Sequence, residues 1–410
     1  MIKSIKGGRA WPHKNFIFDQ PIESLTAPKS LAITLWHGGR AVVAKGDQLK
    51  ANAQVGFDFN GLPVFTGLAG RVTSVDDFPG LLARPKDFDF PRTTVFIETE
   101  PEQPAREPVF EPCPRFGKLS QAELAGRVFT AGVADLRKDG LEKHLIFNGL
   151  DLEPPLSTNV RLLKERSEQL IEGMRIVMQI HGSIKARLVL SSRMKALNAD
   201  LKSLLASAVN ISIEKVEPKY PQQNGQLIRQ TVYRSQSAAI YGMEALLNVR
   251  QAVVLGQPLA TKFCTLCDDT KGKKSLAEVY IGASAAETLN LRTQDYSNLK
   301  LISGGLLSGT CHYSLQLPVD RNTSGLMFYR NPSLRENHPC INCGQCLSIC
   351  PAGLAPARIF PLVRDGQNEE LARLKPENCL ECGLCTFICP SGLLLSHQIK
   401  VGKMILEGKL

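Results

Sequence analysis

The sequence has 410 residues, a formal net charge of +10 and 12 cysteines. At roughly 100–200 residues per domain, this length predicts two to four domains, each with a hydrophobic core. Hydrophobic residues make up 43% and charged residues 21%, which excludes a disordered chain, a collagen and a small disulfide scaffold. Because no uninterrupted run of 18 apolar residues is present and the first residues lack the apolar core of a signal peptide, we expect no membrane span and a cytoplasmic location.

The first 115 residues are expected to form an N-terminal arm and a small β-module. Pro and Gly punctuate residues 1–30, which predicts an extended arm, and alternating stretches over 31–76 predict short antiparallel strands. The phrase KGDQLKANAQVG resembles the barrel-sandwich of lipoyl and biotinyl carrier domains, but FDFNGLPVF lacks the lysine that would carry the group. We therefore expect a structural module. Residues 77–118 are rich in proline and predict an irregular linker, with Cys113 as a structural residue.

Residues 116–255 are expected to form an α/β domain, because strand and helix patterns alternate and such alternation indicates a parallel sheet. The helix over 158–180 places its apolar residues on one face, with Thr158 as a candidate N-cap. The expected strands cover 144–149, 187–191 and 209–216, and the other expected helices cover 119–127, 238–248 and the stretch between the last two strands.

Positive charge is concentrated between residues 181 and 240, which contain nine Lys or Arg and three Asp or Glu. This stretch is either a solvated face or a docking surface for an acidic protein or an anionic membrane. No helix-turn-helix, zinc-finger or aromatic RNA-binding motif accompanies the charge, so we expect no nucleic-acid partner.

Eight of the 12 cysteines lie between Cys340 and Cys389. The segments CINCGQCLSICP (340–351) and CLECGLCTFICP (379–390) both fit C-x2-C-x2-C-x3-C-P, the spacing that bacterial two-cluster ferredoxins use. Three thiolates at this spacing surround one 4Fe-4S cluster, and the fourth, which is expected to start a helix, ligates the other cluster. The predicted ligands are Cys340, Cys343, Cys346 and Cys389 for the first cluster, and Cys379, Cys382, Cys385 and Cys350 for the second.

A pair of zinc sites is the main alternative for these motifs. Zinc takes four ligands, often as two separated C-x2-C pairs, whereas each run here has four cysteines followed by Pro351 or Pro390. Cys264 and Cys267 form a further C-x2-C, but in a strand the two side chains point to opposite faces. We assign these two cysteines, and Cys311, structural roles, unless Cys311 and His312 fold back to complete a site.

The order of motifs resembles the RnfC-type subunit family of the Rnf complex, a membrane complex that couples electron transfer between ferredoxin and NAD to ion translocation. The segments that carry the resemblance are GGRAWP (7–12), NGLDLEPPLSTNVRLLKERSEQLIEGMRIVMQ (148–179), YPQQNGQLI (220–228), LISGGLLSG (301–309), DRNTSGLMF (320–328) and the twin cysteine motifs.

This resemblance implies a multidomain α/β plus α+β fold. Its parts are the barrel-sandwich module, a parallel-sheet α/β domain like the flavoprotein subunit of respiratory complex I, a shortened β-grasp region over 256–329, and a two-cluster ferredoxin domain over 330–410. It also implies that Asn148, Asp151 and Glu153 match positions of the family's flavin pocket.

The sequence departs from the family at the Gly-rich loop Gly-Gly-Ala-Gly-Phe-Pro-Thr. The matching region is LAGRVFTAGVADL (124–136), where Arg127, Val128 and Phe129 replace glycines. Glycines in such loops let backbone amides approach a phosphate, and we expect these three side chains to fill the space of the flavin. We therefore expect that FMN and NADH binding is lost and that the acidic positions are vestigial.

The leading functional hypothesis is a peripheral electron-transfer subunit on the cytoplasmic face of the membrane, relaying single electrons through two 4Fe-4S clusters. Its expected partners are other subunits of a membrane complex and a redox protein such as ferredoxin or a partner flavoprotein. Two alternatives remain open: an FMN-containing, NADH-oxidising subunit, and a soluble iron–sulfur partner of another enzyme.

Overall fold

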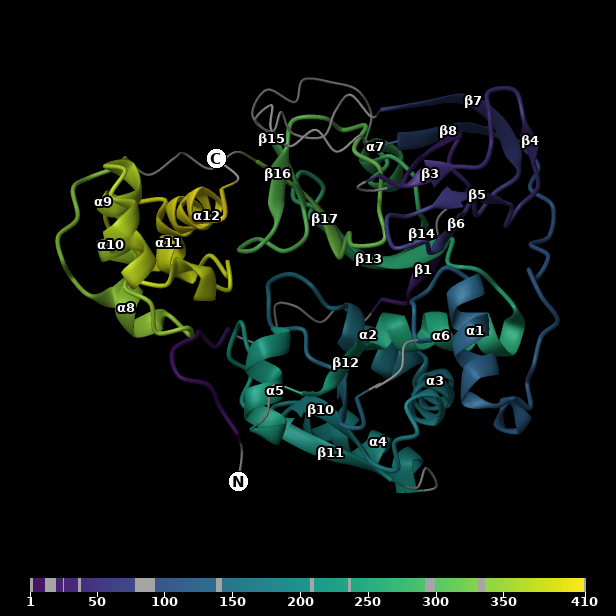
Figure 1. Cartoon of the computed structure of the whole chain (residues 1–410), viewed down its shortest axis with the longest axis horizontal. Helices are drawn as coiled ribbons and strands as arrows, with labels where there is room; N and C mark the ends of the chain where they lie inside the picture. The colour runs from purple at the N-terminus through teal and green to yellow at the C-terminus, as the bar shows by residue number, and fades with distance from the viewer. Residues whose placement is uncertain are drawn as a thin grey trace.

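The computed structural model describes residues 3–11, 20–24, 26–35, 38–77, 93–137, 142–206, 210–234, 237–291, 299–330 and 336–408. A lobe of short helices, formed by residues 336–408 and called here the C-terminal helical domain, lies at the left of Figure 1. The α/β domain lies at the bottom, and the strands of the N-terminal module lie at the upper right. Within the described residues, no helix is long and apolar enough to cross a membrane.

The N-terminal module consists of two small antiparallel sheets around one core. One sheet has the order β2-β8-β7-β4, and the other has the order β3-β5-β6. Leu31, Ile33 and Val55 are fully buried between them. The strands are β2 (Ser30–Thr34), β3 (Arg40–Ala41), β4 (Gln48–Leu49), β5 (Gln54–Phe57), β6 (Pro63–Phe65), β7 (Gly70–Asp77) and β8 (Thr93–Thr99).

Strand β8 corrects the expectation that residues 77–118 are an irregular linker. It pairs with β2 on one side and β7 on the other, and Val95 and Ile97 contribute fully buried side chains. The sequence TTVFIET has the strand-forming residues and the alternation typical of a strand, but the many prolines around it favoured a linker assignment. Residues 78–92 of the expected linker lie outside the described residues.

The α/β domain contains the expected parallel sheet, in the order β11-β10-β9-β12. Alternate residues point to opposite faces, so Leu145 and Phe147 pack against one layer of helices and Ile146 against another. The strands are β9 (Leu145–Asn148), β10 (Ala186–Ser191), β11 (Ile211–Val216) and β12 (Ala239–Gly242). The helices are η3 (Phe116–Lys118), α1 (Gln121–Thr130), α2 (Thr158–Glu165), α3 (Ser167–Ile180), α4 (Lys195–Ala206), α5 (Gly225–Tyr233) and α6 (Met243–Leu255).

Two sequence predictions in this domain were wrong. The stretch 238–248 is not one helix, because its first half is strand β12, and helix α6 begins only after Gly242. The helix over 158–180 is divided at Arg166 into α2 and α3, and Ser157, not Thr158, is the N-cap residue. Asp151 supplies the carboxylate that Val160 N needs at this helix start (2.7 Å), a partner too far away in sequence for the local capping pattern to reveal.

A six-stranded mixed sheet joins the modules, in the order β1-β14-β13-β17-β15-β16. Cys264 is fully buried in its core, and Cys267 Sγ lies 3.3 Å from Tyr329 Oη. Cys311 lies on the edge strand and is exposed. Its elements are β1 (Glu23–Ser24), β13 (Thr261–Asp268), β14 (Lys273–Tyr280), α7 (Ala285–Thr288), β15 (Leu299–Ser303), β16 (Thr310–His312) and β17 (Gly325–Arg330).

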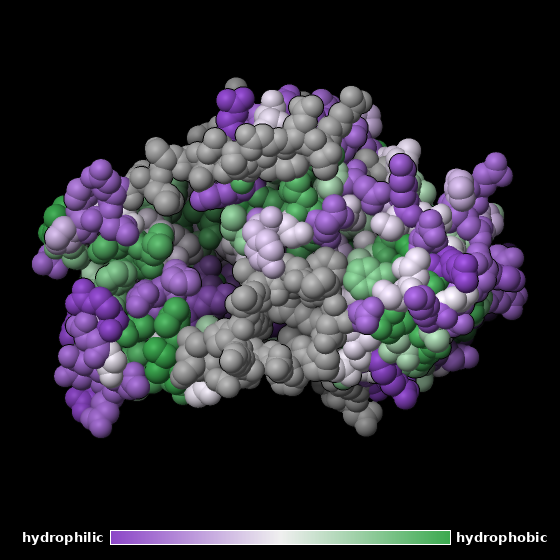
Figure 2. Space-filling model, turned by 90° about the horizontal axis from the view of Figure 1, so that it is seen from above, coloured by the Kyte–Doolittle hydropathy of each residue, from purple (hydrophilic) through white to green (hydrophobic). Residues whose placement is uncertain are grey.

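The C-terminal helical domain shows the internal repeat expected from the cysteine motifs. Each motif contains a five-residue helix, α8 (Gln345–Ile349) in the first copy and α11 (Leu384–Ile388) in the second. The fourth cysteine of each motif ends this helix, which corrects the expectation that it begins one. The remaining helices are α9 (Pro356–Arg364), α10 (Asn368–Arg373), η4 (Pro376–Asn378) and α12 (Leu395–Leu406). Figure 2 shows hydrophobic surface on this left-hand lobe beside strongly hydrophilic patches.

Residues 3–11, called here the N-terminal strap, tie the C-terminal helical domain to the α/β domain. Lys3 pairs with Val216 at the end of β11, and Arg9 and Tyr220 exchange backbone hydrogen bonds of 2.9 and 2.8 Å. On the other side, Gly8 N donates to Ile349 O (2.9 Å), and the ring of Trp11 meets that of Phe387 edge to face at 5.2 Å.

Candidate functional site

The structure brings the eight motif cysteines together as two sets of four around two small cavities. Within the described residues, no three His, Cys, Asp or Glu side chains are close enough to share a single metal ion. Each set takes three cysteines from one motif and one from the other, as the spacing predicts. The first cavity is lined by Cys340, Cys343, Cys346 and Cys389, and the second by Cys350, Cys379, Cys382 and Cys385.

Backbone conformation explains how each motif curls around its cavity. Gly344 and Gly383 have φ of 72° and 75° and begin the short helices α8 and α11. Asn342 and Glu381 hold φ of 52° and 53° at matching positions between the first and second cysteines. Left-handed residues at these points reverse the chain direction within three residues, so that successive cysteines face inward.

The two sets differ in their exposure to solvent. Cys340 and Cys343 are exposed, whereas every cysteine of the second set is half-buried or buried. Burial raises the pKa of Cys385 to about 12, and electrostatic repulsion from the neighbouring Cys379 acts in the same direction. Because metals bind the thiolate, metal loading of this buried set must release protons.

The second set lies against the α/β domain. Tyr220 Oη donates to Cys382 O (2.8 Å), and Leu384 packs in one core with Ile146 and Val189 of the parallel sheet. At Gly383, a Cβ atom would lie only 2.4 Å from Leu307 O. The second set therefore lies against both the α/β domain and the loop that follows β15 of the six-stranded sheet, whereas Cys340 and Cys343 of the first set are exposed.

The residues expected to be remnants of a flavin pocket have partners within the protein. Asn148 Oδ1 accepts from Leu150 N (3.2 Å), and its Nδ2 donates to Gln223 O (3.3 Å). Asp151 accepts from Val160 N (2.7 Å) and Asn159 Nδ2 (3.2 Å). Burial raises the pKa of Asp151 to about 6, although these hydrogen bonds act in the opposite direction.

Glu153 anchors the loop that follows β15. Its carboxylate accepts from Leu307 N (2.8 Å), Ser308 N (2.7 Å) and Ser308 Oγ (2.6 Å), and only 5% of the residue is exposed. A Cβ on Gly305 would lie 2.3 Å from Glu153 Oε1. The carboxylate therefore joins the α/β domain to the six-stranded sheet beside the second cysteine set, and its accepting atoms are occupied.

The region matching the Gly-rich loop is helical up to Thr130. Val128 is fully buried in the core, where it packs with the helices on one face of the parallel sheet. Arg127 donates to Glu111 O (2.7 Å), and the guanidinium of Arg137 lies over the ring of Phe129. Only Val128 enters the domain interior, so the expectation that all three side chains fill the flavin space is too simple.

A cavity of about 180 Å³ remains next to this region. An ion pair at its wall joins Lys262 to Glu244 (3.7 Å), and Arg321 donates to the carbonyls of Gly132 and Val133. A second cavity of about 340 Å³ adjoins it, shares Leu259, Ile281 and Arg321 with it, and is lined by Gly132 of the same region. The smaller cavity lies below the usual range of ligand pockets, about 300–1,000 Å³, and the larger one lies within it. Sequence reasoning missed these three charged side chains because they come from different domains, and no local motif links them.

Gln222 was also missed. It follows Tyr220 and Pro221, is fully buried, and has no partner for either amide atom within the described residues. Unpartnered buried amides are rare in folded proteins.

Two family models match the chain. Residues 122–246 match the Nuo51 FMN-binding domain, and residues 339–393 match the 4Fe-4S dicluster domain. The first covers the parallel sheet, and the second covers both cysteine sets. The chain is therefore a multidomain α/β protein with a Nuo51-like domain and a dicluster domain.

Curated relatives match most of the chain. A protein of the ion-translocating oxidoreductase complex of Haemophilus influenzae is 24% identical over 81% of this chain. A protein of the proton-translocating ferredoxin:NAD(+) oxidoreductase complex of Clostridium ljungdahlii is 23% identical over 92% of this chain and 87% of its own length. Both relatives are RnfC-type subunits of their complexes.

The chain is a distant homologue of RnfC-type subunits. Its match to the RnfC-type protein of Haemophilus influenzae spans 43% of that protein, so it covers less than half of the relative's length. The RnfC-type subunit of Acetobacterium woodii is 24% identical over 78% of this chain and 76% of its own length. Among solved structures, an NAD+-reducing NiFe-hydrogenase in the H2-reduced state matches 73% of this chain and 65% of its own at 15% identity, with a TM-score of 0.48.

Proposed function

We propose that this RnfC-like chain is an electron-transfer subunit of a membrane-associated, ion-translocating oxidoreductase, and that its eight motif cysteines hold two 4Fe-4S clusters. The observation that carries the proposal is the sorting of the cysteines into two cavities, each completed by the fourth cysteine of the other motif. A 4Fe-4S cluster supplies one-electron chemistry when bound. The protein supplies the thiolates, the two differing environments and the contacts to neighbouring domains.

The unequal exposure of the two cysteine sets supports an assignment of which set faces the rest of the complex and which faces an external partner. The second set contacts the α/β domain through Tyr220 and Leu384, so it faces the side on which a donor inside the complex would lie. The first set opens to solvent at Cys340 and Cys343. We place the contact with an external redox protein, such as ferredoxin, at this exposed side.

The proposed domain roles follow the sequence analysis. Residues 1–115 form the arm and a barrel-sandwich module, 116–255 a degenerate flavin-type domain, 256–329 a reduced β-grasp region and 330–410 the two-cluster domain. The chain is proposed to lie on the cytoplasmic face of the membrane as a peripheral subunit. The occupied acceptors of Asp151 and Glu153 support the loss of flavin and NADH binding.

The metal content of anaerobically purified protein tests the cluster assignment. Two 4Fe-4S clusters require about eight iron and eight sulfide per chain. Cys343→Ser and Cys382→Ser, which each remove one ligand from a different set, should each lower iron content toward half, while Cys113→Ser should retain all of it. A wild-type value near four irons contradicts the two-cluster assignment, and zinc in place of iron contradicts it altogether.

A second candidate function is an FMN-dependent, NADH-oxidising subunit, which the match to the Nuo51 FMN-binding domain favours. Acid release of flavin from the purified chain and NADH-dependent bleaching separate the two functions. Stoichiometric FMN that NADH reduces contradicts the proposed loss of the pocket but leaves the cluster assignment standing. Co-purification with integral membrane subunits separates both from a soluble redox partner of another enzyme.

A further inference from the structure

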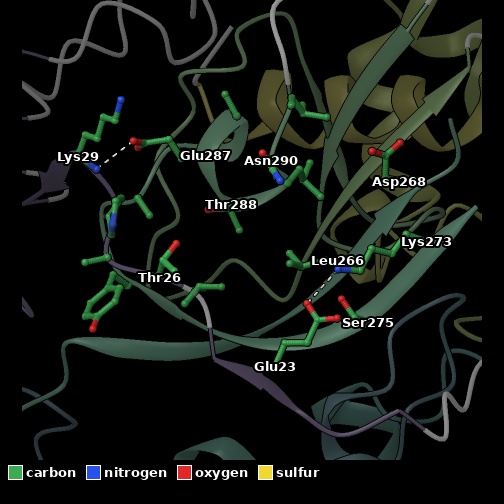
Figure 3. Close-up of a pocket in the computed structure, with 18 of the residues that line it drawn as sticks. Glu23, Thr26, Lys29, Leu266, Asp268, Lys273, Ser275, Glu287, Thr288 and Asn290 are labelled. Carbon is green, nitrogen blue, oxygen red and sulfur yellow. Dashed lines mark hydrogen bonds and ion pairs between the residues drawn. The ribbon is translucent and has the colours of Figure 1, made fainter. Parts of the chain in front are cut away.

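The carboxylate of Glu153 is buried, yet within the described residues it has no cationic partner. Only 5% of the residue is exposed, and the three groups that donate to it are neutral. Glu23, which lines the pocket of Figure 3, shows the more usual arrangement: its Oε2 lies 3.2 Å from Lys273 Nζ, as the dashed line marks. A charge that is buried without a counter-ion acts more strongly on its surroundings than one that is paired or surrounded by water.

The hydrogen bonds at Glu153 are those of an ionised carboxylate. Its Oε1 accepts from Leu307 N (2.8 Å) and Ser308 N (2.7 Å), and its Oε2 accepts from Ser308 Oγ (2.6 Å). An ionised carboxylate only accepts hydrogen bonds, whereas the protonated form also has a hydrogen to donate. Because all three partners donate, we assign Glu153 a negative charge.

The loop after β15 connects this charge to the second cysteine motif. Leu307 N donates to Glu153, and Leu307 O lies so close to Gly383 that a Cβ atom there would overlap with it. Gly383 stands between Cys382 and Cys385, two of the ligands proposed for the second cluster. A single residue of the loop therefore separates the buried carboxylate from the backbone that curls around the second cavity.

Other charges lie outside the two cavities. Apart from the cysteines, the described residues that line them carry no formal charge. Lys403 Nζ donates to Cys379 O (3.0 Å) of the second set, but it is paired with Glu381 (2.8 Å), which also pairs with the exposed Lys400 (3.4 Å). Internal pairing and contact with water weaken the field of this group, whereas neither reduces the field of Glu153.

We propose that Glu153 lowers the reduction potential of the second cluster and has little effect on the first. This inference rests on the cluster assignment proposed above. A negative charge in a region of low dielectric constant opposes the addition of an electron nearby, and cluster potentials depend on local charge and burial. A lower potential at the second cluster favours electron transfer from it to the exposed first cluster. Glu153 is therefore a positioning residue for the relay and not a ligand.

Glu153→Gln removes the charge and keeps the hydrogen bonds, because the amide oxygen can accept from Leu307 N and Ser308 N while the amide nitrogen donates to Ser308 Oγ. The measurement is a redox titration of the full-length, cluster-loaded protein at neutral pH, followed by electron paramagnetic resonance. Reduction of one cluster should become at least threefold more favourable, where a tenfold change is about 59 mV for a one-electron couple. The other cluster should change less than twofold. A change below threefold in both clusters, an equal change in both, or a change that disfavours reduction overturns the proposal.

Variants that retain a single cluster identify which cluster responds. Cys343→Ser leaves the second set complete, and Cys382→Ser leaves the first set complete. Glu153→Gln should raise the potential in the Cys343→Ser background and not in the Cys382→Ser background, and the reverse result overturns the proposal. Iron content is measured first. About eight irons in the wild type keep the cluster assignment standing, so that a missing shift then contradicts only the role of Glu153.

Two control variants separate the charge from the structure of the loop. Ser308→Ala removes one hydrogen bond of the same loop but keeps the carboxylate, so it should not raise the potential of the second cluster. Glu172→Gln removes an equal charge from α3, which packs on the opposite face of the parallel sheet from Leu384, and should leave both potentials within twofold. A rise in Ser308→Ala that equals the rise in Glu153→Gln attributes the effect to loop structure and overturns the proposal.

Discussion

The buried carboxylate of Asp151, which contacts the start of helix α2, makes the stability of the folded protein depend on pH. Its hydrogen bonds to Val160 N and Asn159 Nδ2 begin helix α2. Burial is nevertheless the largest influence on its pKa, which rises to about 6. The folded protein therefore holds this proton more tightly than the unfolded chain, in which an aspartate has a pKa of about 3.9.

This difference predicts that Asp151 makes the folded state less stable as pH rises from about 4 to 6, and that the loss is complete above the folded pKa. Asp151→Asn should remove that dependence. The free energy of unfolding of the wild type, measured from pH 4.5 to 7, should fall relative to the variant by an amount on the order of 2 kcal/mol. Parallel pH profiles for the two proteins are incompatible with a raised pKa at this position.

Glu153 predicts a local effect on stability. Glu153→Ala leaves Leu307 N, Ser308 N and Ser308 Oγ without their acceptor, and each buried donor left unpaired costs about 1–3 kcal/mol. Amide hydrogen exchange at residues 306–309 should accelerate at least tenfold, whereas exchange in strand β5 of the N-terminal module should not change. Unchanged protection at 306–309 contradicts the anchoring role of the carboxylate.

At the scale of elements, α3 and α6 pack closely in the α/β domain. Gly173 lies where a Cβ atom would be 2.3 Å from Leu246 O, so the absence of a side chain sets how near the two helices approach. Gly126 lies inside α1 with nothing within 4 Å of its Cβ position. The two glycines both lie within helices but have opposite packing constraints.

Alanine substitution should therefore have opposite effects at these two positions. Gly173→Ala forces α3 and α6 apart and should lower the free energy of unfolding by about 2 kcal/mol or more, as overpacked sites do. Gly126→Ala should raise it by about 0.5–1 kcal/mol, because alanine is the better helix former. Urea denaturation of both variants is the measurement, and a destabilised Gly126→Ala would show that the open space beside α1 is needed for folding.

Sequence patterns predicted elements well where the signal is local. Strands β9 and β10 and the parallel sheet were predicted correctly from apolar runs, and the cysteine spacing grouped the residues that line each cavity. Strand β12 was missed because AIYG is short and runs directly into helix α6. The partners of Asp151 and Glu153 could not be predicted, because they depend on tertiary contacts with Val160 and with the 307–308 loop.

At the scale of the whole molecule, the N-terminal strap contacts both the C-terminal helical domain and the α/β domain and adds to the direct contacts between them. Gly7 has φ of 58°, and a Cβ there would lie 2.7 Å from Ile349 O at the end of α8. Gly272 has nearly the same φ, 62°, but nothing lies within 4 Å of its Cβ position. An alanine at either position should therefore suffer similar backbone strain. Only the alanine at position 7 should also clash with the C-terminal helical domain.

Gly7→Ala should loosen the seam between these domains. We expect limited proteolysis between the exposed residues 336 and 340 to become at least fivefold faster than in the wild type, while Gly272→Ala leaves that rate within twofold. Equal acceleration in both variants would attribute the effect to backbone strain alone, and no acceleration in either would show that the strap does not hold the seam.

The strap also imposes an order on biosynthesis. Residues 3–11 leave the ribosome early, yet their contacts at Ile349 and Phe387 belong to a part of the chain that is made much later. During translation these residues can pair with Val216 and Tyr220 well before the second cysteine motif exists. Domains fold largely in the order of synthesis, so the seam beside the second cysteine set closes as a late assembly step.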